Sequence, residues 1–154
     1  MTFTIGKSKE NEDWNFAQWS IYSKKPYWTI QFDMEQALTG KATLTLGFVS
    51  AHPPRGGRTN LQVKVNGKEV DAVHLPKTGT AGYRSGGSDN VYNVVYVTFE
   101  AALLKKGTNE ITLGHSEAQP AAEWKRGVPG QVMYDAIRLE IDPDSSSRKG
   151  PEKP

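Results

Sequence analysis

Apolar residues recur at every second position in several short runs of this chain. In residues 27–32 and 43–48 one side of each run is entirely apolar, formed by Trp28, Ile30 and Phe32 and by Leu44, Leu46 and Phe48. A period of two residues is typical of a strand with one buried face, since successive side chains point to opposite sides. Further strands are predicted at residues 61–65, 91–99, 109–113 and 132–141, where β-branched and aromatic residues gather.

The segments between these runs carry turn and cap signals. Asn66-Gly67 follows the run at 61–65 and predicts a type I′ hairpin that returns through residues 68–70. Residues 100–106 predict one or two helical turns, with Gly107 as the C-cap. The longer connections predicted are residues 33–40, 50–60, 71–81 and 114–130.

Many short strands, one short helical turn and no strand–helix alternation predict an all-β chain folded as a β-sandwich. With 154 residues the chain is long enough for one domain with its own core. We expect this domain to span residues 1–142. Residues 143–154 are rich in Ser, Lys and Pro without an apolar pattern, which predicts a disordered tail or linker.

Composition excludes several classes of protein and site. The chain has no Cys, which excludes disulfides, thiolate zinc sites and cysteine nucleophiles. A net charge of +2 is too small to predict nucleic-acid binding, and no apolar run reaches the roughly 20 residues of a membrane helix. Residues 1–6 do not resemble a signal peptide, although the chain can still derive from a secreted parent.

Residues 82–93 are rich in side chains that can form hydrogen bonds or stack on a ligand. Three glycines allow unusual turns, and Tyr83, Arg84, Asn90, Tyr92 and Asn93 offer two rings, a guanidinium and two amides. This composition fits a loop that recognises saccharides or carboxylates, placed on the rigid strand that follows. It equally fits a long strand connection whose Asp and Asn bond to their own backbone.

Basic side chains gather at two further places, Arg55 with Arg58 and Lys125 with Arg126, the second next to Trp124. They are either solvated loop charges or part of an anion-binding surface.

Asp135 shares the odd-numbered face of residues 132–141 with Met133, Ile137, Leu139 and Ile141. A carboxylate on an inward face needs partners. Asp135 is therefore expected to be buried, either tying down a loop backbone or acting as a ligand of a structural calcium ion.

No motif predicts catalysis. The chain lacks a phosphate-binding glycine loop, a metal-binding His pair and a nucleophile elbow, and His52, His74 and His115 are far apart. We therefore expect no cofactor, apart from the candidate structural calcium.

Six stretches together resemble the C-terminal domain of rhamnogalacturonan lyases, polysaccharide lyase family four. In the order of that family they are residues 13–18, 28–32, 61–67, 83–90, 103–109 and 130–140. The resemblance implies a jelly-roll sandwich of the galactose-binding-like kind, described in that family as similar to carbohydrate-binding modules. Those lyases cleave the galacturonate–rhamnose backbone of pectin by β-elimination. Their catalytic Lys and His belong to an N-terminal domain that is similar to nothing in this chain, so the resemblance implies a non-catalytic domain.

Two functions follow from this resemblance. The first is a carbohydrate-binding module for pectic, rhamnogalacturonan-type polysaccharide in a secreted parent protein. Tyr83, Tyr92 and Trp124 would stack on sugar rings, while Asn90 and Asn93 would bond hydroxyls. Arg84, helped by Arg55, Arg58 or Arg126, would pair with the galacturonate carboxylate. The alternative is an accessory domain that packs against a lyase catalytic domain in cis and does not bind sugar on its own. A free-standing enzyme is a weaker third hypothesis.

Overall fold

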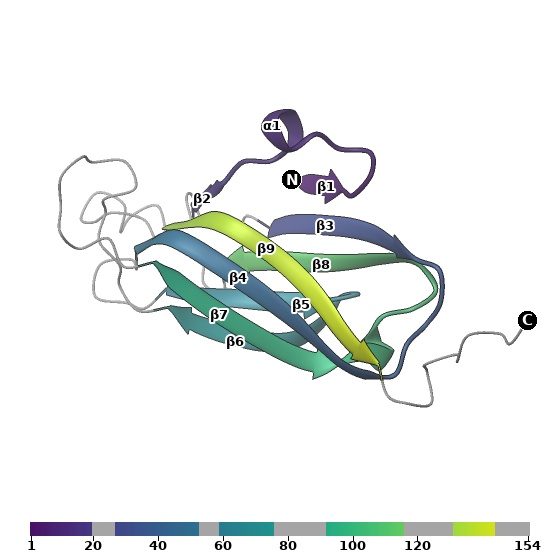
Figure 1. Cartoon of the computed structure of the whole chain (residues 1–154). Helices are drawn as coiled ribbons and strands as arrows, with labels where there is room; N and C mark the ends of the chain where they lie inside the picture. The colour runs from purple at the N-terminus through teal and green to yellow at the C-terminus, as the bar shows by residue number, and fades with distance from the viewer. Residues whose placement is uncertain (20–26, 53–58, 76–91, 116–130, 144–154) are drawn as a thin grey trace, which may run out of the picture.

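In the computed structural model, which describes residues 1–19, 27–52, 59–75, 92–115 and 131–143, two β-sheets pack face to face (Figure 1). Strands make up most of the fold, with the following bounds: β1 Thr2–Thr4, β2 Ala17–Trp19, β3 Tyr27–Met34, β4 Gly40–His52, β5 Thr59–Val65, β6 Lys68–Leu75, β7 Asn93–Glu100, β8 Gly107–His115 and β9 Gln131–Pro143. Helical structure is confined to α1, Glu10–Asp13, and a 3-10 turn, Ala101–Leu103.

The strand order is that of a jelly roll. One sheet runs β1-β3-β8-β5-β6 and the other β2-β9-β4-β7, so β2 to β9 divide into two four-stranded sheets as two Greek keys require. β1 is an addition that pairs in parallel with β3. The predicted all-β, jelly-roll sandwich is therefore confirmed.

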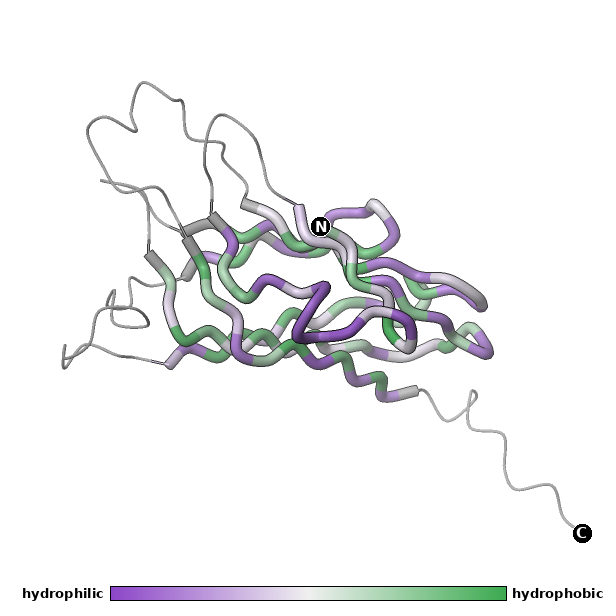
Figure 2. The backbone as a smooth tube through the Cα atoms, turned by 90° about the horizontal axis from the view of Figure 1, so that it is seen from above, coloured by the Kyte–Doolittle hydropathy of each residue, from purple (hydrophilic) through white to green (hydrophobic). Residues whose placement is uncertain are grey.

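The core lies between the sheets and is built by the alternation seen in the sequence. Trp28 and Ile30 of β3 and Leu44, Leu46 and Phe48 of β4 are buried as predicted, and Phe32 is half-buried. Along the strands the colours of Figure 2 alternate between hydrophobic and hydrophilic, as the two-residue period of the sequence predicts. Packed rings close one part of the core: Trp14, Trp28, Phe48 and Tyr134, with neighbouring ring centroids 5.2–6.1 Å apart.

β9 does not keep one face inward along its whole length. Phe48 of β4 is opposite Tyr134 and Gly47 is opposite Ala136, so Asp135 is an extra residue in β9. Such a β-bulge exchanges the two faces of a strand. Val132 and Tyr134 are therefore buried before the bulge, and Ile137, Leu139 and Ile141 face inward after it. The prediction that Asp135 lies buried on the inward face is wrong, since its side chain is exposed.

The Asn66-Gly67 hairpin is confirmed, with both residues at positive φ (49° and 80°) as a type I′ turn requires. Its geometry is also held from outside the hairpin. The Asn66 side chain donates to Leu103 O at 2.8 Å and to the buried Asn109 Oδ1 at 2.9 Å, and its oxygen accepts from Glu110 N at 3.0 Å. The hairpin is thus fastened to β8 and to the 3-10 turn.

Other segments differ from the predictions in extent. β6 continues to Leu75, where an irregular connection is predicted from residue 71 onward. The predicted helical turns reduce to the 3-10 turn, and Gly107 has positive φ (86°) but opens β8 instead of capping a helix. β1 and α1 have no counterpart in the sequence prediction, because segments of three and four residues are too short to show a period. Within the described ranges, no helix is long and apolar enough to cross a membrane.

Candidate functional site

Three large side chains stand exposed in a row along the outer face of β7 and the residue before it. Tyr92, Val94 and Tyr96 are 49%, 43% and 67% exposed, and we call them the tyrosine strip. Val97 and Phe99 of the same strand are buried, so the exposure follows from the alternation of the strand. Large apolar groups arranged contiguously on a surface are typical of a binding face.

Tyr92 is held in place by its neighbours on the sheet. Its hydroxyl donates to Asp135 Oδ2 at 2.9 Å, which connects β9 to the residue before β7 across the intervening β4. The phenol crosses β4 at Gly47, where a Cβ atom would overlap the Tyr92 hydroxyl oxygen and lie 3.1 Å from its ring carbon Cζ. The absence of a side chain at residue 47 and the bulge at Asp135 together allow this arrangement.

The hydrogen bond to Asp135 is the main reason that the pKa of the Tyr92 phenol is raised above its ordinary value. Partial desolvation and the negative charge of Asp135 act in the same direction. The phenol therefore remains a neutral hydrogen-bond donor at physiological pH.

A second group of polar side chains lies two residues further along the same face. Thr45 of β4 is opposite Arg138 of β9 on one side and Tyr96 of β7 on the other. Arg138 Nη2 bonds to Glu140 Oε1 at 2.8 Å, and both side chains are mostly exposed. Exposed ion pairs contribute little free energy, so Arg138 can exchange Glu140 for another anion at small cost.

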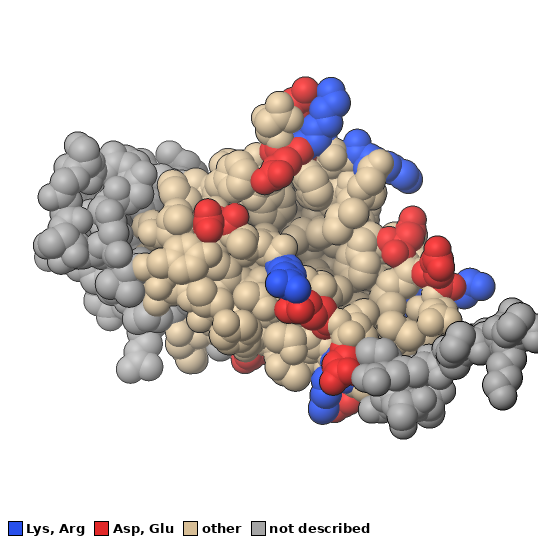
Figure 3. Space-filling model, in the orientation of Figure 1, with Lys and Arg blue, Asp and Glu red and all other residues tan. Residues whose placement is uncertain are grey.

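This sheet face carries aromatic rings, a carboxylate that can accept hydrogen bonds from hydroxyl groups, and a guanidinium cation. In Figure 3, whose orientation shows β9, β4 and β7 in front, scattered charged groups interrupt a surface that is mostly uncharged. Tyrosine rings can cover the C–H face of a sugar, Asp135 can accept from hydroxyl groups, and Arg138 can pair with a carboxylate.

The structure places only some of the sequence-predicted residues. Tyr92 lies on this face, and Asn93 is half-buried at the start of β7, where it already has an interaction partner. The remaining predicted ligand-binding residues lie outside the described ranges: Arg55, Arg58, Tyr83, Arg84, Asn90, Trp124 and Arg126.

Asp135 does not gain metal-binding neighbours within the described part of the chain. No group of three or more His, Asp or Glu side chains gathers there, and Asp135 bonds to a tyrosine instead. Calcium binding at Asp135 stays a prediction.

Sequence reasoning missed Gly47, Tyr96 and Arg138. The run at 91–99 is apolar at nearly every position, so its period did not show which side faces water. The two polar residues of the run, Asn93 and Thr98, have opposite parity, so they did not show the exposed side either.

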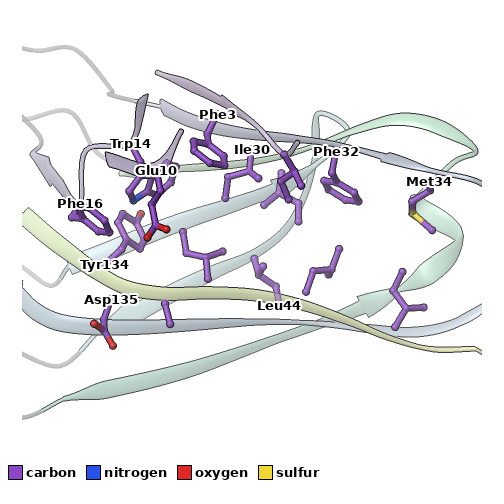
Figure 4. Close-up of a pocket in the computed structure, with 16 residues that line it drawn as sticks. Phe3, Glu10, Trp14, Phe16, Ile30, Phe32, Met34, Leu44, Tyr134 and Asp135 are labelled. Atoms are coloured by element: carbon purple, nitrogen blue, oxygen red, sulfur yellow. The ribbon is translucent and has the colours of Figure 1, made fainter. Parts of the chain in front are cut away.

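A separate apolar groove of about 540 Å³ lies between β9 and the N-terminal segment (Figure 4). It exists because β2 pairs with β9 only over residues 131–133 among the described strands, which leaves the inward face of residues 137–141 partly open. Its walls include Phe3, Trp14, Phe32, Met34 and Leu139, and its few polar residues are Glu10 and Asp135. Ile5 and Phe16, also on its walls, are 60% and 40% exposed.

Two solved structures align with most of this chain. A family 35 carbohydrate binding module from Clostridium thermocellum aligns with a TM-score of 0.44 and 16% identity, over 74% of this chain and 70% of that one. The insecticidal delta-endotoxin Cry8Ea1 from Bacillus thuringiensis aligns with a TM-score of 0.50 and 13% identity, over 79% of this chain and 19% of that one. At 13% identity the second likeness concerns the fold alone.

Sequence comparisons are more specific. The chain is 30% identical over 149 residues to the rhamnogalacturonate lyase of Dickeya dadantii. The match covers 93% of this chain and 22% of the lyase, so the chain spans about a fifth of that relative. Residues 1–139 match the family model described as "CBM-like: Polysaccharide lyase family 4, domain III". The chain therefore belongs to the CBM-like domain III family of polysaccharide lyase family 4.

Proposed function

We propose that this domain is a non-catalytic carbohydrate-binding module for pectic polysaccharide of the rhamnogalacturonan type, in the service of a lyase. The observation that carries this proposal is the outer face of β9, β4 and β7, where the tyrosine strip lies beside Asp135 and Arg138. Membership of a CBM-like family and the name of the Dickeya relative, rhamnogalacturonate lyase, support the class of ligand. Because pectin lies outside cells, the proposal includes a secreted parent protein.

A non-catalytic role in a lyase is consistent with the length of the matched relative. The matched lyase is several times longer than this domain, which leaves room for a separate catalytic domain in such a protein. β-Elimination needs a general base and a group that neutralises the uronate carboxylate, held together in one groove. Among the described residues, the charged groups that line the apolar groove of Figure 4 are the carboxylates of Glu10 and Asp135, and neither can neutralise a negative charge.

The test is a titration of the purified domain with rhamnogalacturonan oligosaccharides, run beside an assay for the ultraviolet absorbance of unsaturated products. We expect weak binding, on the order of −4 to −7 kcal/mol, because a few stacked rings and one ion pair must offset the entropy of association. We expect no increase in absorbance. Absence of binding would refute the binding role, and formation of unsaturated product would refute the non-catalytic role.

The apolar groove favours a second candidate function, an accessory domain that packs against a lyase domain in cis. Exposed Ile5 and Phe16 at a groove with apolar walls are the specific observation. In a longer lyase that carries this domain, Phe16→Asp should then lower the melting temperature, while Tyr96→Ala on the opposite-facing sheet surface should not. If both variants melt like the parent, this second function is excluded.

A further inference from the structure

We propose that the outer face of β9, β4 and β7 recognises a neutral sugar ring followed by an acidic one, and so selects an alternating polysaccharide over a uniformly acidic one. The neutral ring is bound at Tyr92, Gly47 and Asp135, and the acidic ring at Tyr96, Thr45 and Arg138. This inference rests on the proposed carbohydrate-binding function and specifies where, and with what selectivity, that function is carried out.

The first position is suited to a neutral ring. The Tyr92 phenol lies over Gly47 and leaves about half of the side chain exposed, so one side of it is supported by the strand and the other can be covered by a sugar. Its hydroxyl is fixed by the 2.9 Å hydrogen bond to Asp135 Oδ2. Because the side chain is already ordered, stacking of a sugar on the ring costs less conformational entropy. Asp135 is exposed and accepts hydrogen bonds from hydroxyl groups, but its negative charge repels a uronate carboxylate.

The second position carries the opposite charge. Arg138 lies beside Thr45, with the 67% exposed Tyr96 on the other side of Thr45. A guanidinium binds a carboxylate through two parallel hydrogen bonds. Glu140 holds Arg138 in an exposed pair, and an incoming uronate can replace it because such a pair is weak.

The register of the strands relates the two positions. Gly47 is opposite Ala136 and Val94, and Thr45 is opposite Arg138 and Tyr96, so the rows are two residues or about 7 Å apart along the strands. Val94 belongs to the first row, opposite Gly47, and adds an exposed apolar side chain there. A saccharide that spans both rows meets the Asp135 carboxylate beside the first row and the Arg138 guanidinium in the second, which favours a neutral ring followed by an acidic one.

The experiment is calorimetric titration of the domain with three oligosaccharides of equal length. They are an alternating rhamnose–galacturonate oligomer, an oligogalacturonide and a neutral galactan oligomer. For the parent domain we expect the alternating oligomer to bind best. Arg138→Gln should weaken its binding roughly threefold to tenfold, the effect of losing a charge-assisted hydrogen bond at an exposed site. Added salt should then affect binding less than in the parent.

Lys41→Gln provides the matched control. Lys41 is another exposed cation on the same face, paired with Glu100 and opposite Asp142, but it lies four residues along β4 from Thr45. Its loss should leave all three affinities unchanged. Asp135→Asn is the second informative variant, because it removes the repulsion and should improve oligogalacturonide binding relative to the alternating oligomer by about threefold.

The outcomes separate this inference from the proposed function. If the parent domain binds none of the oligosaccharides, both are wrong. If the parent binds the alternating oligomer but Arg138→Gln behaves like Lys41→Gln, or Asp135→Asn leaves the selectivity unchanged, only the inference is overturned. Melting temperatures of all variants identify any loss of folding, and Arg138→Lys, which keeps the charge without the two-pronged geometry, then replaces Arg138→Gln with the same expected direction.

Discussion

Gly47 is the residue whose missing side chain matters most on the sheet face. We predict that Gly47→Ala pushes the Tyr92 hydroxyl away from Asp135, because the new methyl group would overlap that hydroxyl. Stability should change by less than about 1 kcal/mol, since the Tyr92 ring is half-exposed and can turn outward. Sugar affinity should fall, as measured by titration of the variant. The control is a double-mutant cycle: in a Tyr92→Ala background, Gly47→Ala should have no further effect on affinity.

Tyr134 is a buried tyrosine with a hydrogen-bonded hydroxyl in the core. It is buried, and its hydroxyl donates to the buried Gln18 Oε1 at 2.6 Å, while Gln18 Nε2 donates to Leu113 O at 3.1 Å. We predict that Tyr134→Phe lowers the free energy of unfolding by roughly 1–3 kcal/mol, because Gln18 loses this donor in the core. Urea denaturation measures the change. A variant as stable as the parent would mean that water replaces the hydroxyl.

The same residue predicts how stability depends on pH. Burial raises the pKa of the Tyr134 phenol well above its ordinary value, so the folded state keeps a proton that the unfolded state releases above about pH 10. Stability should therefore be complete below about pH 10 and decline as the pH rises further. Urea denaturation at a series of alkaline pH values should show a smaller decline for Tyr134→Phe than for the parent. Equal declines would assign the effect to other groups.

Among the turns, the β5–β6 hairpin depends on Asn66 for two separate reasons. Its positive φ suits Asn or Gly, and its side chain bonds to Leu103, Asn109 and Glu110. We predict that Asn66→Gly costs roughly 1–3 kcal/mol through the lost bonds, and that Asn66→Ala costs about 1 kcal/mol more through backbone strain. Thermal or urea unfolding of both variants measures the two costs. Equal costs would show that the backbone conformation contributes nothing.

The bulge in β9 is the irregularity on which the sheet face depends. Deleting Asp135 should prevent folding, because either Val132 and Tyr134 or Ile137, Leu139 and Ile141 would then turn to the wrong side of the sheet. Replacing Asp135 by Ala keeps the chain length and should change the free energy of unfolding by less than about 0.5 kcal/mol, as for most exposed side chains. Circular dichroism and thermal melting of the two variants test this contrast. A folded deletion variant would contradict it.

For the whole molecule, we predict that removing residues 144–154 leaves stability unchanged. These residues lie outside the described ranges, and they include no Ala, Val, Ile, Leu, Met, Phe, Trp or Tyr. Ordering such a segment would cost conformational entropy without burying apolar surface. Thermal melting of the truncated chain should match that of the full chain within about 1–2 °C. A drop of several degrees would show that the tail binds to the domain.

Features that depend on neighbouring residues in the chain could be read from the sequence. The strands containing Trp28 and Leu44 show a period of two because one of their faces is buried, and the Asn66-Gly67 turn needs only the φ angles of its own residues. The family resemblance also allowed the jelly-roll order of the strands to be predicted. Tyr92 was named from the sequence as a candidate ligand-binding residue, because aromatic residues beside polar loops are a local signal, and the structure places it exposed on the sheet face.

Features that depend on pairing between distant strands could not be read in this way. The bulge that moves Asp135 outward exists only as a mismatch between β4 and β9, which are more than 80 residues apart at that point. The row of Arg138, Thr45 and Tyr96 exists only once three strands are in register. Local periodicity tells how a strand alternates but not which strand lies beside it, and for that reason only the tertiary structure shows which residues share the proposed binding face.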